Sequence, residues 1–214
     1  PTAPQAQDES QAKQLDPLAL HTPSLALTCA AREALRVGDF VEQMLTDLGR
    51  LMRENHRASA DDIRRLDDVV DSLYKQVKFY LTQVSRTPMG ERDSRRWTDI
   101  ISFTINLEQV GDIIEKSAND VVNKNLDRNR NFSEAGMTEL CDLHSRLITN
   151  LRLAMNVFIN NDVNDAQKLI AEKVMFRELE LVNYEKHLTR LADQTVQSIE
   201  TSSLHLDLMR DLKR

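Results

Sequence analysis

The sequence predicts an all-α fold of six long helices that form two tandem three-helix bundles. Only 5 of the 214 residues are Gly and 5 are Pro, too few to punctuate a fold of short strands and turns. Apolar residues make up 41% and charged residues 29% of the chain, which is enough for a buried core. Along most of the chain apolar side chains recur every three or four residues, the spacing of one face of an α-helix.

The first 22 residues are rich in Pro, Gln, Ala and Ser and show no helical periodicity, so we expect residues 1–22 to be a linker. The chain opens on Pro1 without a signal peptide, and we therefore expect an internal cut in a longer protein.

Three helices are expected in the first half, over residues 24–55, 60–86 and 91–124. Ser59, three residues before Asp62, resembles a capping box at the start of the second helix, and the stretch Thr87–Gly90 ends it. The apolar stripe of the first helix consists of Val37, Val41, Met44, Leu48 and Leu51.

Three further helices are expected in the second half. Ser133 is the N-cap of the fourth, which Asn160–Asp162 end, and a fifth follows to about Asp193. The stripe of the fifth helix is Leu169, Ile170, Phe176, Leu181, Tyr184, Leu188 and Leu191, and we expect it to face the core. The sixth helix starts near Val196, and its pattern still runs at Arg214, so we expect it to be truncated.

The two halves repeat with a period of about 100 residues, which predicts a duplicated domain over residues 23–214. Its first bundle is expected over residues 23–124 and its second over residues 133–214.

The chain carries 28 basic and 34 acidic residues without a Lys/Arg block, so nucleic acid is not an expected partner. No run reaches the roughly 20 apolar residues of a membrane-spanning helix. The two cysteines, Cys29 and Cys141, cannot form a disulfide framework and favour a reducing compartment. Cys141 and His144 provide only two of the four ligands of a structural zinc site, so we expect a packed pair.

Paired acids four residues apart are the main candidate site. The pairs are Asp67/Asp71, Glu108/Asp112 and Asp207/Asp211, and this spacing places both carboxylates on one helix face. Oxygen-only ligands suit Mg²⁺, Ca²⁺, Mn²⁺ or a carboxylate-bound iron cluster. The alternative is a solvated acidic face, since such pairs also arise by chance.

The stretch Asn106–Asp112, NLEQVGD, resembles the "LERIGD" signature of PhoU proteins. This resemblance implies two three-helix bundles and a Glu/Asp-x-x-x-Asp motif that binds iron or another divalent metal. Asp67–Asp71 is similar to the family's motif on helix two, and Asp207–Asp211 lies where the second copy is expected. We therefore expect Asp67, Asp71, Glu108 and Asp112 to converge on one metal.

The fourth motif departs from the family, because Lys173 and Arg177 stand where PhoU proteins have acids. These two bases would neutralise Asp207 and Asp211 in place of a metal, so a metal in the second bundle is an open alternative.

A second resemblance extends over nearly the whole chain. Leu15–Pro23, Ala31–Asp39 and Ser202–Arg214 look like parts of the cytoplasmic tail of bacterial sodium-phosphate cotransporters. In that family a sodium-coupled membrane domain precedes a PhoU-like domain. The resemblance implies a regulatory domain on the cytoplasmic side of the inner membrane, with its own transporter's membrane domain as partner; a homo-oligomer is a further alternative.

Two other functions stay open at the level of sequence. One is a free-standing PhoU-like adaptor for phosphate uptake and signalling. The other is a carboxylate-bridged metalloenzyme, but a di-iron oxidase of the ferritin type needs Glu-x-x-His on two helices, and none occurs. No phosphate loop, nucleophile elbow or His-Glu-x-x-His motif is present, so we do not expect an enzyme.

Overall fold

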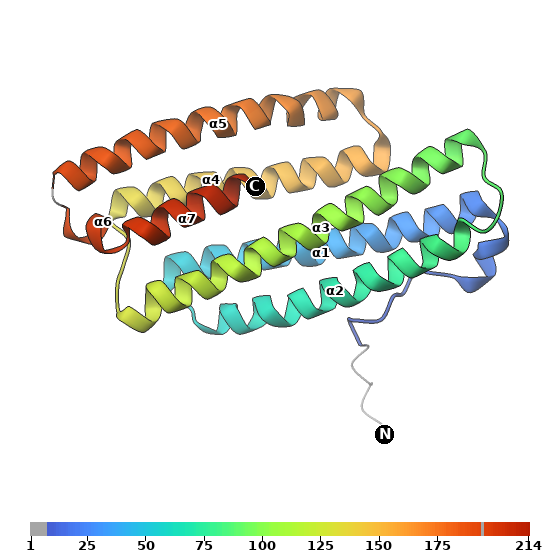
Figure 1. The fold of residues 1–214 in the computed structure, drawn as a ribbon, viewed down its shortest axis with the longest axis horizontal. Helices are drawn as coiled ribbons and strands as arrows, with labels where there is room; N and C mark the ends of the chain where they lie inside the picture. The colour runs from blue at the N-terminus through green and yellow to red at the C-terminus, as the bar shows by residue number, and fades with distance from the viewer. Residues whose placement is uncertain (1–7, 194) are drawn as a thin grey trace, which may run out of the picture. The chain divides into compact units, whose positions relative to one another are not determined.

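The structure is a computed structural model that describes residues 8–193 and 195–214, and every regular element in these residues is helical (Figure 1). The elements are the 3-10 helices η1 (Pro17–His21) and η2 (Leu126–Arg128) and the helices α1 (Pro23–Glu54), α2 (Ala58–Val84), α3 (Glu91–Lys124), α4 (Glu134–Asn160), α5 (Val163–Ala192), α6 (Val196–Glu200) and α7 (Ser202–Lys213).

Contacts divide the chain into two compact units. One contains residues up to Val41 together with Arg65–Gln109, and the other contains Glu42–Arg64 together with Val110–Arg214. This division differs from the expected bundles 23–124 and 133–214, because α1, α2 and α3 are long enough to contribute residues to both units.

The apolar stripe expected on α1 is buried along its whole length. Val37, Val41, Met44 and Leu51 have no exposed surface, and Leu48 is 1% exposed. Burial of such side chains is the main source of stability for an amphipathic helix, because a helix of this kind is marginal alone. The expected first helix is therefore confirmed.

The start of α2 differs from the capping box expected at Ser59. The helix begins at Ala58, and Ser59 lies within its first turn, where the Ser59 hydroxyl is 2.9 Å from His56 Nδ1. Asn55, at a left-handed φ of 52°, makes the turn that precedes it. The turn closes earlier than the sequence pattern indicated, because Asn adopts this conformation readily.

The connection between α4 and α5 agrees with the sequence. The Ser133 hydroxyl accepts a hydrogen bond from Gly136 N at 3.2 Å and caps α4. Asn161 ends that helix at a left-handed φ of 53°. Asp162 then caps α5 by accepting hydrogen bonds from the backbone N–H groups of Asn164 and Asp165.

The expected sixth helix is broken into α6 and α7 at Thr201. The Thr201 hydroxyl donates to the Gln197 carbonyl at 2.7 Å, and the Thr201 backbone N–H donates to the same carbonyl at 3.1 Å. The Thr201 backbone, with φ of −106° and ψ of 5°, departs from regular helical values and makes the break. The sixth helix was therefore wrongly expected to be continuous.

The stripe expected to bury α5 is mostly exposed. Phe176 is 7% exposed, but Ile170, Leu181, Tyr184 and Leu188 are between 46% and 70% exposed. In the part of α5 that α7 contacts, the buried residues are Asn183 and His187, so the helix turns a different face inward from the one that the apolar stripe indicated. The expectation that this stripe faces the core is wrong for these four residues.

Residues 8–22 of the expected linker form hydrogen bonds to helices α1 and α2. η1 is capped by Asp16, whose side chain accepts from Leu18 N, and Ala19 is buried. The Tyr80 hydroxyl on α2 donates to the Asp16 carbonyl at 2.7 Å. Polar side chains of α1 and α2 satisfy this backbone, which composition alone does not reveal. Residues 1–7 of the expected linker lie outside the described residues.

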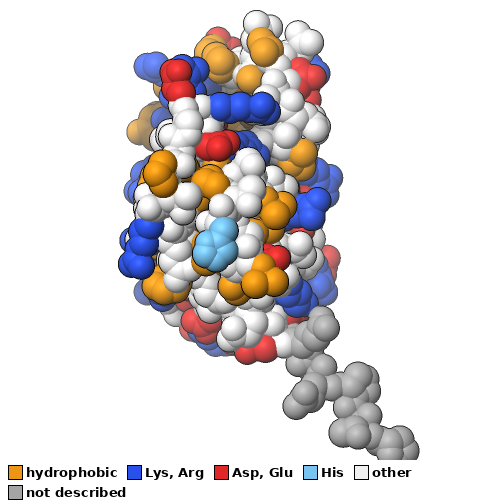
Figure 2. All heavy atoms as spheres, turned by 90° about the vertical axis from the view of Figure 1, so that its right-hand side faces the viewer, with side chains coloured by type: hydrophobic (Ala, Val, Ile, Leu, Met, Phe, Trp, Pro, Cys, Tyr) orange, Lys and Arg blue, Asp and Glu red, His pale blue; other side chains and the backbone are white. Residues whose placement is uncertain are grey.

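The face drawn in Figure 2 intersperses basic, acidic and hydrophobic side chains. On that face neither sign of charge forms a continuous patch, in line with the mixed charge pattern of the sequence. Among the described residues, none of the helices combines the length and the apolar character needed to cross a bilayer.

Candidate metal centre

Three acids of α2 and α3 lie close enough to share one ion. Asp71 and Glu108 belong to the same compact unit, and Asp112 follows one helical turn after Glu108 on α3. Each offers a carboxylate oxygen, and these oxygens all lie within 4.8 Å of one another. Ligands on opposite sides of a Mg²⁺ or Ca²⁺ ion are about 4 to 5 Å apart, so the separation fits a shared cation.

The three acids sit at the edge of the core, where water is only partly excluded. Asp71 and Glu108 are half-buried and Asp112 is exposed, while the neighbouring Leu107 and Gly111 are buried. Lys75 Nζ lies 3.2 Å from Asp71 Oδ2, one turn further along α2. Three carboxylates this close repel one another, and a bound cation would lower that repulsion.

Asp67 is outside this group among the described residues. It is half-buried on α2, one turn before Asp71. Of the four acids expected to converge, the structure therefore brings three together. Helical spacing places Asp67 and Asp71 on one face of α2, but only the approach of α3 decides which of them meets Glu108.

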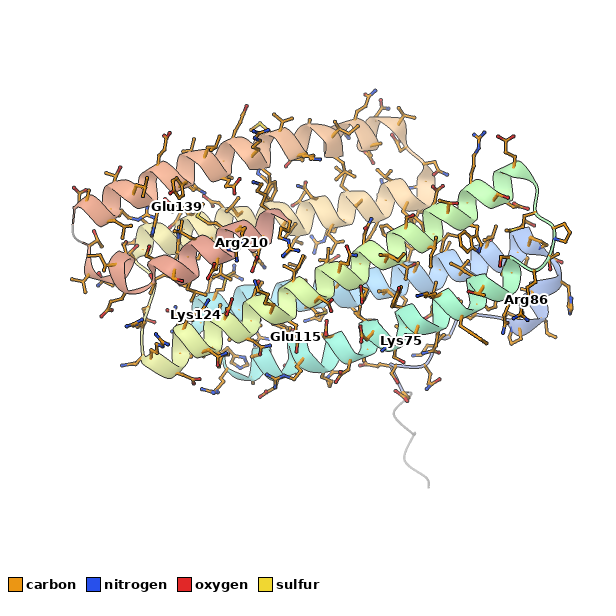
Figure 3. All side chains as sticks on the ribbon, in the orientation of Figure 1. Lys75, Arg86, Glu115, Lys124, Glu139 and Arg210 are labelled. Carbon is orange, nitrogen blue, oxygen red and sulfur yellow. The ribbon has the colours of Figure 1, made fainter. Side chains whose placement is uncertain are left out.

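The acids of α7 are paired with bases instead. Lys124 Nζ lies 2.9 Å from Asp207 Oδ2, and Lys116 Nζ lies 2.5 Å from Asp211 Oδ2. Arg210 on α7 reaches both acids, with Nη1 3.0 Å from Asp207 and Nε 3.3 Å from Asp211. Figure 3 shows Lys124 on α3 and Arg210 on α7. The hydrogen bond from Lys124 holds the pKa of Asp207 below its usual value.

The bases that neutralise the α7 acids are not those the sequence indicated. Lys173 and Arg177 are exposed on α5, and the ion pairs of Asp207 and Asp211 run to Lys116, Lys124 and Arg210. The sequence correctly indicated compensation by bases, but it assigned them to the wrong helix. Lys116 and Lys124 are two turns apart on α3, whereas Asp207 and Asp211 are one turn apart on α7. Because the two spacings differ, the sequence pattern does not indicate that these lysines pair with these acids.

A buried polar cluster joins α4, α5 and α7, and the sequence did not reveal it. Arg190 forms two parallel hydrogen bonds with Glu139, at 2.7 and 2.8 Å. His205 Nε2 is 3.3 Å from Glu139 Oε2, and the His205 ring stacks on His187 with centroids 4.7 Å apart. Glu139, His187 and His205 are all buried. A paired, bidentate arrangement of this kind is what makes a buried carboxylate tolerable.

The cluster shifts the titration of its members. Burial acts to raise the pKa of Glu139, but His205 and Arg190 outweigh burial and lower it to about 2. Burial, together with the positive charges of His205 and Arg190, lowers the pKa of His187 to about 4. Glu139 is therefore an anion and His187 is neutral near pH 7.

His187 also contacts Ser202, but the pair is not arranged for nucleophilic catalysis. His187 Nε2 lies 2.8 Å from Ser202 Oγ, while His187 Nδ1 faces Arg190 Nη2 at 3.5 Å. Because Arg190 can only donate, Nδ1 is the acceptor and Nε2 carries the proton. A protonated Nε2 cannot remove the proton of Ser202, so the contact is structural.

His144 is a packed histidine, as expected. It is 2% exposed, its Nε2 is 2.6 Å from the Leu45 carbonyl on α1, and burial lowers its pKa. A side chain at Gly49 would clash with this ring, because a Cβ there would lie 2.6 Å from His144 Cε1. The glycine thus permits the close approach of α4 to α1.

Comparison with known proteins connects this geometry to a family. The PhoU domain family matches residues 34–121, a range that contains Asp71, Glu108 and Asp112. The crystal structure of PhoU from Pseudomonas aeruginosa has a similar fold, with a TM-score of 0.77 over 87% of this chain and 88% of that chain. At 16% identity this likeness concerns the fold alone, and it confirms the expected all-α fold of PhoU type.

Two longer relatives match almost the entire chain. They carry the name "Putative inorganic phosphate export protein YjbB" and come from Escherichia coli strain K12 and Salmonella typhimurium strain LT2. The identities are 43% and 44% over 211 residues, 99% of this chain. The chain spans 39% of the length of each of these relatives.

Proposed function

We propose that this chain is the regulatory PhoU-like part of a membrane protein that moves inorganic phosphate, and that it acts from the cytoplasmic side of the inner membrane. The observation that carries the proposal is the match of 99% of the chain to longer proteins named for phosphate export. The sequence resemblance to sodium-phosphate cotransporter tails supports a sodium-coupled membrane domain as the partner. The role proposed is control of transport, with no catalytic step.

The proposal includes a divalent metal, such as iron or manganese, at Asp71, Glu108 and Asp112. A bound cation would replace the Lys75 contact of Asp71 and would tie α2 to α3 at the edge of the core. Because Asp207 and Asp211 have bases at hydrogen-bonding distance, the proposal does not extend to them.

The metal proposal is tested on the purified chain by elemental analysis after incubation with Mn²⁺ or Fe²⁺ and dialysis. We expect about one ion per chain, and loss of that ion in the Glu108→Ala/Asp112→Ala variant. Asp207→Ala/Asp211→Ala is the matched control and should keep the ion. Equal metal content in all three proteins would contradict the proposal.

The transport role is tested on the longer gene product by measuring movement of radioactive phosphate across the membrane in both directions. Removal of residues 23–214 should change the phosphate flux, because the restraint on the membrane domain is lost. Abundance of the truncated protein in the membrane is the control. Unchanged flux at equal abundance would overturn the regulatory role, whatever the metal content.

A further inference from the structure

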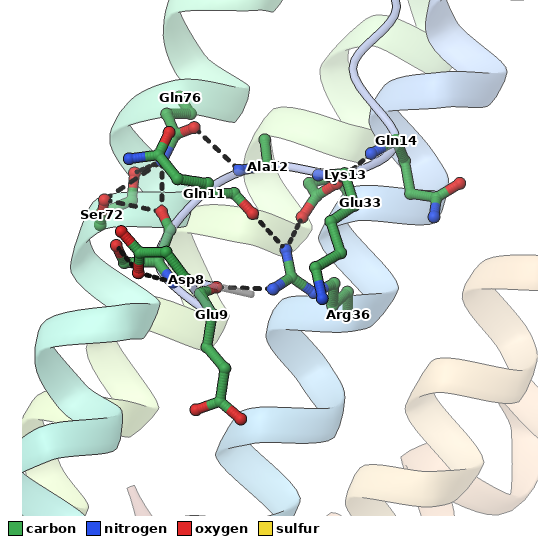
Figure 4. A network of polar contacts seen from close by, with 11 residues as sticks. Asp8, Glu9, Gln11, Ala12, Lys13, Gln14, Glu33, Arg36, Ser72 and Gln76 are labelled. Carbon is green, nitrogen blue, oxygen red and sulfur yellow. Dashed lines mark hydrogen bonds and ion pairs between the residues drawn. The ribbon is translucent and has the colours of Figure 1, made fainter. Parts of the chain in front are cut away.

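Residues 8–16, here called the strap, run along α1 and α2 through a turn at Glu9 and Ser10 and further bends, and they are held by their main chain (Figure 4). Between Glu9 and Gln14, six main-chain groups bond to helix side chains: the carbonyls of residues 9, 10 and 11 and the N–H groups of residues 12, 13 and 14. The partners are four side chains, here called the polar groove: Glu33, Arg36, Ser72 and Gln76.

Gln76 forms hydrogen bonds with the strap at two points. Its Nε2 donates to the Ser10 carbonyl at 2.7 Å, and its Oε1 accepts from the Ala12 N–H at 2.9 Å. The Ser72 hydroxyl donates to the same Ser10 carbonyl at 3.0 Å. A primary amide that donates to the carbonyl of one residue and accepts from the N–H of the second residue along binds main-chain groups alone, so these two contacts do not depend on the side chains of the strap.

Glu33 and Arg36 supply the charged half of the groove. Glu33 Oε2 accepts from the N–H groups of Lys13 and Gln14, at 2.9 and 2.7 Å. Arg36 donates to the carbonyls of Glu9 and Gln11, at 2.5 and 2.8 Å, and to Glu33 Oε1 at 2.7 Å. Glu33 has no exposed surface. Its carboxylate is thus satisfied by the strap and Arg36 together.

The side chains of the strap take little part in this recognition. Those of Gln11, Lys13 and Gln14 are exposed, and Ser10 and Ala12 are half-buried. The ion pair between Glu9 and Arg65 is 2.8 Å long, with both side chains at least half exposed. Exposed pairs of this kind contribute little, so the main-chain contacts dominate.

We propose that the polar groove is a binding site for a peptide main chain in the turned conformation of the strap, and that the protein fills it with its own strap in a reversible manner. The segment between Glu9 and Gln14 buries no large apolar side chain, and water can replace each hydrogen bond when the strap leaves. Release opens Glu33, Arg36 and Gln76 without removing any core residue. A force or binding event on the strap is therefore transmitted to α1 and α2. This inference goes beyond the proposed function and does not depend on it.

The first test compares two variants at one position of the full chain by hydrogen exchange. Gln14→Pro removes the N–H that donates to Glu33, whereas Gln14→Ala keeps it. In the wild type and in Gln14→Ala, we expect the Ala12 and Lys13 amides to exchange at least roughly tenfold more slowly than in an unfolded peptide. In Gln14→Pro this protection should be lost, while the melting temperature shows that the helices stay folded. Equal loss in both variants, or no protection in the wild type, would overturn the proposal.

The second test supplies the strap in trans. A labelled peptide of residues 8–16, DESQAKQLD, is added to the Gln14→Pro protein, and its fluorescence anisotropy is followed. We expect binding that survives alanine at Gln11 and Gln14 but weakens at least roughly tenfold when the Ala12 nitrogen is methylated. Binding that follows the side chains, or no binding of the parent peptide, would contradict main-chain recognition.

Discussion

The acid pair on α3 and the acid pair on α7 lie 99 residues apart in the sequence and have the same spacing, yet they meet opposite surroundings. Glu108 and Asp112 lie close to a third acid, Asp71, which forms an ion pair with the exposed Lys75 on α2. Asp207 and Asp211 meet Lys124 and Lys116 of α3. One motif thus supplies a candidate cation site in one place and internal ion pairs in the other, and the helix that packs alongside decides which.

The largest loss of stability is expected at Glu139 on α4. This acid belongs to the buried polar cluster of α4, α5 and α7. Glu139→Gln leaves the Arg190 guanidinium buried without its anion, and breaking such a pair costs about 3 to 5 kcal/mol. The measurement is the free energy of unfolding from urea denaturation. Glu178→Gln, at an exposed position of α5, is the control and should lie within about 0.5 kcal/mol of the wild type. Similar values for both variants would show that the cluster is not a stabilising centre.

A fall in pH should lower the free energy of unfolding through His187, which belongs to the buried polar cluster of α4, α5 and α7. Its folded pKa of about 4 lies below the ordinary value of 6.5, so in this window the unfolded chain binds the proton and stability falls as the pH falls. Between pH 7 and pH 5 this one group accounts for a loss of about 2 kcal/mol. In His187→Gln, where an amide can still bond Ser202, the loss over this range should be smaller by that amount. An unchanged slope of unfolding free energy against pH would rule out this assignment.

Glu139 adds a second loss at lower pH. Its folded pKa of about 2 lies below the ordinary 4.5, so its stabilising contribution is present above pH 4.5 and disappears as the pH falls toward 2. Acid unfolding of the wild type should therefore steepen below pH 4.5, and Glu139→Gln should lack this steepening.

The smallest effect compares the two pairs directly, without added metal. Asp211→Asn removes the charge that Lys116 and Arg210 meet at a 1% exposed side chain, and we expect a loss of about 1 to 3 kcal/mol. Asp112→Asn removes one of three crowded charges at an exposed position, and we expect a change within about 0.5 kcal/mol or a slight gain. Thermal unfolding of the two variants side by side checks this, and the reverse order would contradict the comparison.

Much of the fold could be predicted from local patterns. The bounds of α3 agree with the expected 91–124, and Ser133 and Asn161 begin and end α4 as expected. These features are set within a few residues, by caps and by apolar periodicity, and so they are readable from the chain alone. The break at Thr201 was missed, because no Gly or Pro marks it in the sequence.

The candidate site was only partly predictable. The helical spacing selected Asp71, Glu108 and Asp112, but it also selected Asp67, and the family resemblance assigned Lys173 and Arg177 to the α7 acids. The cluster around Glu139 left no local signal, since its contacts between helices join residues that are 15 to 66 positions apart in the sequence. A sequence gives the period of each helix, while the pairing of side chains depends on the rotation of one helix against the next.

By itself the sequence determined that this chain forms long amphipathic helices and that acids recur on them at one-turn spacing, because both properties follow from the 3.6-residue period. Only the tertiary structure decided which acids lie beside acids and which beside lysines, and that residues 8–16 lie in a polar groove. Those outcomes depend on contacts between residues far apart in the chain, whose geometry no local pattern fixes.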